Sequence, residues 1–391
     1  MKTQSLQVVS LEGGPTSRGR QHGELLSAKI HELLDRWDEG LLRVYGISRA
    51  RYVERFYAET KFEQALQIYA PSVLEEVRAI AQGANADYRT LLAWQHINEE
   101  FWLALPTAPR GEACSTIALG RHGKSPSLIG QNLDLDAYLD GYQILLNHRC
   151  DRSDGRILAT SVPGMISLNG MNSHGFAVCD NALVKLRADL AGVPIFAIYR
   201  LLLESRTLVE AVGLIERLPH ASGLNWVMGD PAGVAMYERS AGRVVKYGPD
   251  DPSRPIYHTN HPIRNEDITL LPGGRPNRST HLRFAALDER LRGLDRPLSV
   301  ELIKSILAGR DDRDYPISRD GGRNEGDENI GFTLACCIFE LDAASPRLHI
   351  ASGPPHLCEF RTFRPEPIAD CGLEGVSHDA PNGAAEGFPP E

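Results

Sequence analysis

The chain has 391 residues and a formal net charge of −9, and its acidic and basic residues are interspersed. This balance argues against binding to nucleic acid or to an anionic membrane surface. No apolar stretch approaches the roughly 20 residues of a membrane span, and the first residues are too polar for a secretory signal. The seven cysteines, an odd number without metal-ligand spacing, argue against a disulfide framework. We therefore expect a cytoplasmic enzyme.

The first part of the chain, from about 18 to 103, has the periodicity of helices. One apolar stripe recurs at steps of three and four residues: Leu26, Ile30, Leu33, Trp37 and Leu41. A proline at the first turn and a glycine at the end predict a further helix from Pro71 to Gly83. A third helix is predicted from about 90 to 103. The proline-containing run 105–111 then ends the helical pattern.

Strand patterns dominate from residue 114 onward, separated by turn signals such as Asp154-Gly155. The predicted strands are 114–120, 127–134, 142–150, 156–161, 165–170, 175–181, 224–230, 233–239, 242–246, 332–340 and 346–352. Helices are predicted at about 193–205, 207–218, 279–292 and 299–308. Strand blocks that alternate with helix pairs predict stacked sheets covered by helices. The tail from 366, rich in Pro, Gly and acidic residues, is expected to be disordered.

Cys114 opens the first of these strands, and the second strand ends in Asn132-Leu133-Asp134. In a hairpin, the second strand would return beside the first and bring these polar side chains close to the cysteine. One interpretation is a nucleophilic cysteine with its supporting groups. The alternatives are a structural cysteine, because small buried cysteines are common, and hairpin-end residues that bond their own backbone.

The boundary between helices and strands suits a chain that cuts itself before Cys114. The thiol would attack the carbonyl of Ala113, and water would resolve the resulting thioester. The freed amine, with an ordinary pKa of about 8, can serve as the base for its own thiol. Such a site also needs a carboxylate to hold the amine and amide donors to stabilise the oxyanion. Asp134 and Asn132 are the nearest candidates in the sequence.

Short motifs follow one another in a fixed order along most of the chain. They occupy 19–23, 75–84, 113–116, 130–134, 170–178, 181–183, 258–261 and 277–287. Their order and spacing resemble the isopenicillin N acyltransferase-like family of cysteine N-terminal nucleophile (Ntn) hydrolases, distantly related to penicillin V acylase and bile salt hydrolase. The resemblance extends to about residue 356.

The resemblance implies an α+β fold, a four-layer αββα sandwich that matures by autocatalytic cleavage. Residues 1–113 would form a helical N-terminal segment that is released as a small subunit and stays associated. Residues 114–365 would form the catalytic sandwich, and 366–391 a flexible tail. Cys114 would be the nucleophile and its freed amine the base. Asp134 would bind that amine, while Asn132 would order the same strand end.

The later motifs carry over as the groups that stabilise the oxyanion. Asn260 would supply the side-chain amide, and the backbone N–H of Asn181 would be the second donor. Arg283 is the counterpart of the family's arginine, and Arg278 competes with it. As alternatives, Asn181 caps a turn, Arg283 is a solvated helix residue, and the two histidines that flank Asn260 bind a metal ion.

Departures from the family pattern bear on the reaction. Gln131 stands where the bile salt hydrolase branch has arginine, which argues against that branch. Asn329-Ile330 precede Gly331 where the acyltransferase has Ser-Arg, so we expect that arginine to be missing and penicillin-like acyl transfer to be disfavoured. No segment resembles a nucleotide-binding loop for coenzyme A.

We therefore predict an amide hydrolase that acts on a small-molecule amide through an acyl thioester on Cys114. It would need neither cofactor nor metal, and its partners would be its substrate and its own N-terminal segment, with a homo-oligomer left open. The alternatives are an acyltransferase whose acceptor is an amine, such as 6-aminopenicillanic acid, or coenzyme A, and an inactive binding protein.

Overall fold

The computed structural model describes residues 6–97, 99–100, 114–249, 251, 253–269, 278–294, 298–321 and 331–366. Three predictions fall wholly or partly on other residues: the tail beyond 366, the end of the third helix, and Ala113 at the predicted cleavage site. They lie outside the described residues and stay predictions.

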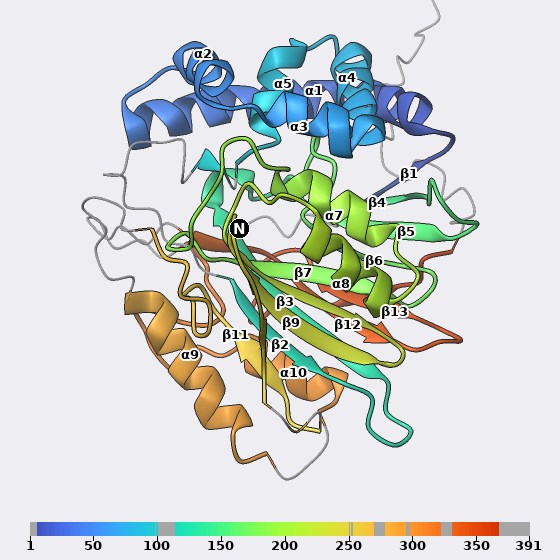
Figure 1. The fold of residues 1–391 in the computed structure, drawn as a ribbon, viewed down its shortest axis with the longest axis vertical. Coiled ribbons are helices and arrows are strands. Elements are labelled where there is room, and N and C mark those ends of the chain that lie inside the picture. The colour runs from blue at the N-terminus through green and yellow to red at the C-terminus, as the bar shows by residue number, and fades with distance from the viewer. Residues whose placement is uncertain are drawn as a thin grey trace, which may run out of the picture.

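Helices of the N-terminal segment gather at one end of the molecule (Figure 1). They are α1 (Pro15–Tyr45), α2 (Arg49–Glu59), α3 (Phe62–Tyr69), α4 (Pro71–Ala84) and α5 (Tyr88–Trp94). The stripe predicted between 26 and 41 is buried along α1. Glycines let α1 and α4 touch, because a Cβ at Gly23 would lie 2.3 Å from the Ile80 carbonyl oxygen. The sequence did not predict α2 and α3, and α5 ends earlier than expected.

The larger sheet has eight strands in the order β1-β4-β5-β6-β7-β8-β9-β10. Their bounds are β1 Gln7–Leu11, β4 Ile144–Arg149, β5 Arg156–Ser161, β6 Asn169–Asn172, β7 Ala177–Ala182, β8 Leu224–Asp230, β9 Gly233–Arg239 and β10 Val244–Tyr247. β1 was not predicted and pairs in parallel with β4. The N-terminal segment is therefore not only helical, because it supplies the edge strand of this sheet.

The smaller sheet has six strands in the order β11-β2-β3-β12-β13-β14. Their bounds are β2 Ser115–Leu119, β3 Ser127–Asp136, β11 Ile256–His258, β12 Gly331–Leu341, β13 Arg347–Ala351 and β14 Arg361–Phe363, and a 3-10 helix, η1 (Ala137–Leu139), follows β3. The predicted hairpin of β2 and β3 is present, with Ser115 opposite Asn132. A bulge in β12 interrupts its pairing with β3 between Thr333 and Ala335, beside Asp134.

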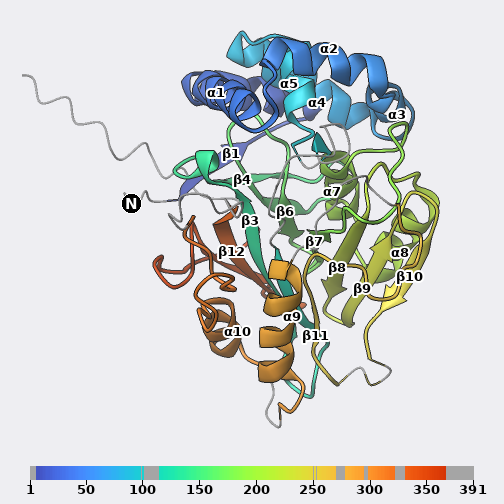
Figure 2. The same cartoon turned by 90° about the vertical axis from the view of Figure 1, so that its left-hand side faces the viewer.

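The two sheets pack face to face, with helices on both outer faces (Figure 2). α7 (Ile195–Leu203) and α8 (Leu208–Arg217) cover the larger sheet, and α9 (Arg278–Leu291) and α10 (Val300–Leu307) cover the smaller one. Side chains alternate between the two sides of each strand, as in Cys336 and Cys337, which enter different apolar clusters. The predicted four-layer αββα sandwich is confirmed.

No helix in the described part of the chain is long and apolar enough to cross a membrane.

Candidate active site

Cys114 lies immediately before β2, where the ends of both sheets meet the N-terminal helices. Its side chain is buried in an apolar cluster that also contains Leu133 and Leu334. Burial raises the pKa of the thiol well above its ordinary value, and the charges of Asp180 and Asp134 raise it further. A hydrogen bond from the backbone N–H of Asp134 and the charge of Arg283 act in the opposite direction. The thiol therefore needs a base before it can attack a carbonyl.

Arg283 links Cys114 to Asn260. Its Nη1 donates to the Cys114 carbonyl oxygen over 2.7 Å and to Ser115 Oγ over 2.9 Å, and its Nη2 donates to Asn260 Oδ1 over 3.0 Å. The side-chain Nδ2 of Asn260 donates to the Ala182 carbonyl oxygen, 3.1 Å away. Because its oxygen is held by the guanidinium, the Asn260 carboxamide presents its NH₂ group toward the end of β7.

The structure distinguishes the two candidate arginines. Arg283 is fully buried on α9, whereas Arg278 is exposed at the first residue of that helix. Arg283 shares its helix face with Leu287 and Leu291, both buried. This spacing of four residues is the signal that could have selected Arg283 from the sequence, because it places the arginine on the stripe that faces the sheet.

Asp134 sits on β3 opposite the bulged part of β12. Its Oδ1 accepts a 2.7 Å hydrogen bond from Thr333 Oγ1. Burial raises the pKa of its carboxyl to about 7, although Arg319, Arg283 and the Thr333 hydroxyl all favour the charged form. A buried carboxyl with a pKa near neutrality can either accept or donate a proton, which suits a general base.

A different arginine, Arg319, acts on Asp134 from the segment before β12. One backbone hydrogen bond runs from the Thr333 N–H to the Arg319 carbonyl oxygen, and the Arg319 N–H donates to Thr333 Oγ1 over 3.0 Å. Of the charges that favour the ionised form of Asp134, that of Arg319 has the largest effect. Gly331 leaves room for the guanidinium, because a Cβ there would lie 2.6 Å from Nη1.

The side chains of the other two predicted asparagines, Asn132 and Asn181, bond groups other than Cys114. The Asn132 amide donates to the carbonyls of Leu307 and Ile317, so it anchors the region around α10 and not the cysteine. Asn181 Oδ1 accepts hydrogen bonds from Thr116 Oγ1 and Asn225 Nδ2, which ties β7 to β2 across the sandwich. Its buried Nδ2 has no hydrogen-bond partner among the described residues.

Two buried carboxyl groups were missed by sequence reasoning: Asp180, whose charge acts on Cys114, and Glu99, which the charge of Asp180 affects in turn. Asp180 on β7 accepts a hydrogen bond from the Tyr199 hydroxyl on α7, and burial raises the pKa of its carboxyl to about 6. Glu99 of the N-terminal segment accepts hydrogen bonds from the Ile195 N–H and Ser222 Oγ. Burial raises the pKa of Glu99 to about 7, and the charge of Asp180 adds to that rise. Neither residue makes a salt bridge within the described ranges, and neither has a local sequence signature.

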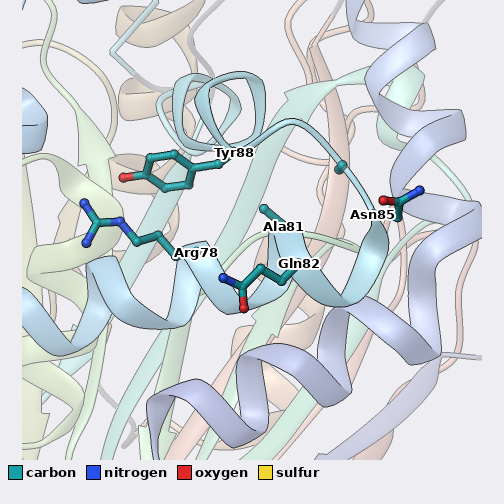
Figure 3. Close-up of a pocket in the computed structure, with 6 residues that line it drawn as sticks. Arg78, Ala81, Gln82, Asn85 and Tyr88 are labelled. Carbon is teal, nitrogen blue, oxygen red and sulfur yellow. The ribbon is translucent and has the colours of Figure 1, made fainter.

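A pocket of about 330 Å³ opens elsewhere, between α4 and the start of α5 (Figure 3). Its lining residues are Arg78, Ala81, Gln82, Asn85, Ala86 and Tyr88. They include neither a cysteine nor a carboxylate, so this pocket does not provide the chemistry that surrounds Cys114. Within the described ranges, no group of three or more His, Cys, Asp or Glu residues could hold a metal ion.

A family model described as acyl-coenzyme A:6-aminopenicillanic acid acyl-transferase matches residues 119–353. The chain is 27% identical over 340 residues to the acyl-coenzyme A:6-aminopenicillanic-acid-acyltransferase 40 kDa form of Emericella nidulans, covering 85% of this chain and 89% of the relative.

Two solved structures align with part of the chain. Penicillin V acylase from Agrobacterium tumefaciens aligns with a TM-score of 0.41 and 17% identity, over 61% of this chain and 83% of that chain. A mutant of the conjugated bile acid hydrolase from Clostridium perfringens aligns with a TM-score of 0.39 and 13% identity, over 63% of this chain and 96% of that chain.

The family match settles the class of protein. It spans more than half of the chain, from the end of β2 to just beyond β13. The family predicted from the order of the motifs is therefore confirmed, and so is the expectation of an enzyme in the class of acyltransferases and amide hydrolases. The chain belongs to the acyl-coenzyme A:6-aminopenicillanic acid acyl-transferase family.

Proposed function

We propose that the chain is a self-processing cysteine amidohydrolase that cleaves a small-molecule amide through an acyl thioester on Cys114. One observation carries this proposal: Arg283 bonds both the Cys114 carbonyl oxygen and the Asn260 carboxamide. The candidate nucleophile and the candidate oxyanion donor are therefore held by one cation, immediately before β2.

Self-cleavage would begin with the Cys114 thiol and the carbonyl carbon of Ala113. As long as the chain is uncut, the Cys114 nitrogen is a peptide nitrogen and cannot act as a base. Asp134, whose carboxyl pKa is raised to about 7, is the group that would take the thiol proton. The new C–S bond replaces the C–N bond, the departing nitrogen gains a proton, and water hydrolyses the thioester. The products are a carboxylate on Ala113 and a free amine and thiol on Cys114.

Turnover would repeat the same chemistry on an external amide. The freed amine of Cys114 takes the thiol proton and later delivers it to the leaving amine, while the thiolate attacks the substrate carbonyl. The oxyanion would be stabilised by Asn260 Nδ2, which must turn from the Ala182 carbonyl oxygen. The backbone N–H of Asn181 would supply the second donor. Water then hydrolyses the acyl thioester.

Acyl transfer to an amine is the second candidate function. Arg319, whose charge acts on Asp134, offers this site an arginine although none stands directly before Gly331. The Emericella nidulans relative is named for transfer from acyl-coenzyme A to 6-aminopenicillanic acid. Water and an amine would compete for the same thioester, so both reactions use one site.

We also propose that the N-terminal segment stays bound after cleavage. β1 pairs with β4, and the helices share one apolar cluster with the larger sheet. A buried ion-pair chain crosses the boundary as well: Glu76 on α4 pairs with Arg200 on α7 and with Arg18 on α1, at 2.8 and 2.6 Å. Separation of the two chains would take Arg200 away from Glu76 and so break a buried ion pair, which is strongly unfavourable.

The cleavage step can be tested on the purified full-length protein. Intact mass and N-terminal sequencing should find fragments 1–113 and 114–391 that elute together, whereas Cys114→Ala should remain a single chain. Cys358→Ala, at a partly buried cysteine outside the site, serves as the matched control and should be cut normally. A wild-type protein that stays full length and still cleaves amides would rule out self-processing.

The fate of the acyl group needs a separate experiment. A small library of amides should be screened for released amine, with Cys114→Ala as the blank. Rapid acid quenching should trap the thioester on the fragment that begins with Cys114. Addition of 6-aminopenicillanic acid or coenzyme A should then leave most of the acyl group as free acid. If mass spectrometry finds most of it on an added acceptor, the enzyme is an acyltransferase.

A further inference from the structure

A second buried carboxylate, Glu238, holds the loop that carries Asn260. Glu238 lies on β9 of the larger sheet and is fully buried. Its two oxygens accept hydrogen bonds from three consecutive backbone N–H groups, those of Ile263, Arg264 and Asn265, over 2.7, 2.8 and 2.6 Å. The Asn265 side chain also donates back to the Glu238 carbonyl oxygen over 3.0 Å. One glutamate therefore fixes the far end of the loop.

The near end of the loop is fixed by the same glutamate through His258. This residue ends β11 in the smaller sheet, and its Nε2 lies 2.8 Å from Glu238 Oε1. Its Nδ1 lies 2.6 Å from the carbonyl oxygen of Thr259. The contact between His258 and Glu238 joins the two sheets, because β9 and β11 belong to different ones.

The hydrogen bonds between His258, Glu238 and the backbone indicate the charge of the Glu238 carboxyl group. A backbone carbonyl accepts but cannot donate, so His258 Nδ1 carries a hydrogen. The contact at Nε2 then needs one further proton, on the histidine or on Glu238. Burial by itself would raise the pKa of the Glu238 carboxyl, but hydrogen bonds from His258 and from the backbone amides lower it overall. Glu238 therefore holds the loop as a carboxylate.

Asn260 lies between these two anchors and makes no contact with Glu238 itself. Its backbone N–H donates to Thr280 Oγ1 on α9 over 2.7 Å, and its side chain is held by Arg283. The helix thus fixes Asn260 from one side, and Glu238 fixes the backbone on both sides of it. A shift of either loop end would move the carboxamide relative to Cys114.

We propose that Glu238 is a positioning residue for the oxyanion donor: its carboxylate, bonded to His258 and to the backbone of 263–265, sets where the Asn260 carboxamide stands at Cys114. This inference rests on the proposed function and deepens it. Misplacement of a reacting group by about 1 Å can cost about 10²-fold in rate. Loss of the Glu238 anchor should therefore reduce kcat by about that factor while KM stays nearly constant.

A double-mutant cycle tests whether Glu238 acts through Asn260. In Glu238→Gln the side chain keeps its size but loses its charge, and one of its two acceptors becomes a donor facing other donors. In the wild-type background kcat should fall about 10²-fold. In the Asn260→Ala background the same change should cost little more, because the group being positioned is already absent. Full additivity of the two losses, or an unchanged kcat in Glu238→Gln, would overturn the proposal.

The chain offers a matched control for this substitution. Glu340 on β12 also contacts a histidine, His349, with Oε2 and Nε2 3.3 Å apart, and this pair is only partly buried and lies outside the site. Glu340→Gln should leave kcat and the double-mutant cycle unaffected. His258→Gln serves as the second variant if Glu238→Gln does not fold, and its loss of kcat should also disappear in the Asn260→Ala background.

Hydrogen–deuterium exchange separates this inference from the proposed function, because it needs no turnover. The amides of 260 and 263–265 should exchange faster in Glu238→Gln than in the wild type, while exchange elsewhere and in Glu340→Gln stays the same. Unchanged exchange at these amides would contradict the positioning role of Glu238 even if the enzyme is active. A wild-type protein that is uncut and inactive would instead contradict the proposed function. The exchange result would still show whether Glu238 anchors the loop that carries Asn260.

Discussion

Cys114 has two unlike sides. On the side of the smaller sheet, its neighbours are Asp134 and Asn260, and cations accompany them: Arg319 beside Asp134, and Arg283 on Asn260. On the side of the larger sheet, the carboxyl group that acts on Cys114 is Asp180, and its charge acts in turn on Glu99 of the N-terminal segment. Neither Asp180 nor Glu99 makes a salt bridge among the described residues.

This contrast suggests a division of roles. Charges that are held in place by arginines and hydrogen bonds are preorganised, which is what transition-state stabilisation requires. Buried carboxyl groups without a cation raise the pKa values around them and cost stability when they ionise. We therefore expect variants on the smaller-sheet side to lose activity. Variants on the other side should keep activity and change pH dependence or stability instead.

Asp134→Asn is expected to have the largest effect. A general base typically contributes about 10²–10⁴-fold to a rate, so self-cleavage should fall by a factor in that range. Turnover should fall as well, because the freed amine of Cys114 loses the carboxylate that holds it. In the wild type, cleavage should accelerate as the pH rises through about 7, where the Asp134 carboxyl loses its proton. The pH dependence of fragment formation on gels measures this. Asp136→Asn, two residues further along β3, is the control and should behave like the wild type.

Asn260→Ala should reduce turnover by about 10²–10³-fold, the cost of losing one oxyanion donor. The loss should appear in kcat and hardly in KM, because the donor acts on the charge that develops during the reaction. Steady-state kinetics on the amide found by screening, with circular dichroism to verify the fold, provide the measurement. An Asn260→Ala enzyme with a near wild-type rate would remove this residue from the site.

Glu99→Gln tests the side of the larger sheet and the N-terminal segment, through its effect on the free energy of unfolding. Burial raises the Glu99 carboxyl pKa to about 7, above its ordinary value of 4.5. A raised pKa favours the folded state at low pH, and that contribution is lost as the pH rises through about 7. At pH 8 the buried charge should cost about 3 kcal/mol relative to acidic pH, and Glu99→Gln should remove that cost.

Urea unfolding at pH 5 and pH 8 measures this difference, with every variant made in the Cys114→Ala background so that each is a single chain. Glu24→Gln, at an exposed position on α1, is the control. An equal effect of Glu99→Gln at both pH values would show that Glu99 does not carry a buried charge.

Asp180→Asn should have the smallest effect of these variants. It tests most directly the contrast between the two sides of Cys114. Of the charges that raise the thiol pKa of Cys114, that of Asp180 is the largest, so its removal should make the thiol more acidic. The pH midpoint for alkylation of Cys114 by iodoacetamide should fall by on the order of one unit. The asparagine can still accept the Tyr199 hydroxyl, so the fold should be kept. A midpoint that rises or stays constant would contradict the assigned charge effect.

The sequence predicted best those elements whose pattern is local. β5, β8 and β9 were predicted at their observed limits, because turn signals bound each of them. β1, β11 and β14 were missed because they are short strands whose pairing depends on a distant neighbour. β6 was placed a few residues too early, where the loop before it is buried and apolar like a strand.

The sequence by itself determined the hairpin that brings Asp134 to Cys114, because strand alternation and a short turn are local properties. It also determined the family, through motifs in a fixed order. Only the tertiary structure selected Arg283 over Arg278, brought Arg319 to Asp134, and placed Glu238 behind Asn260. These contacts join residues far apart in the chain across the sheets and helices of the sandwich, and local periodicity records which face a residue occupies but not what it meets there.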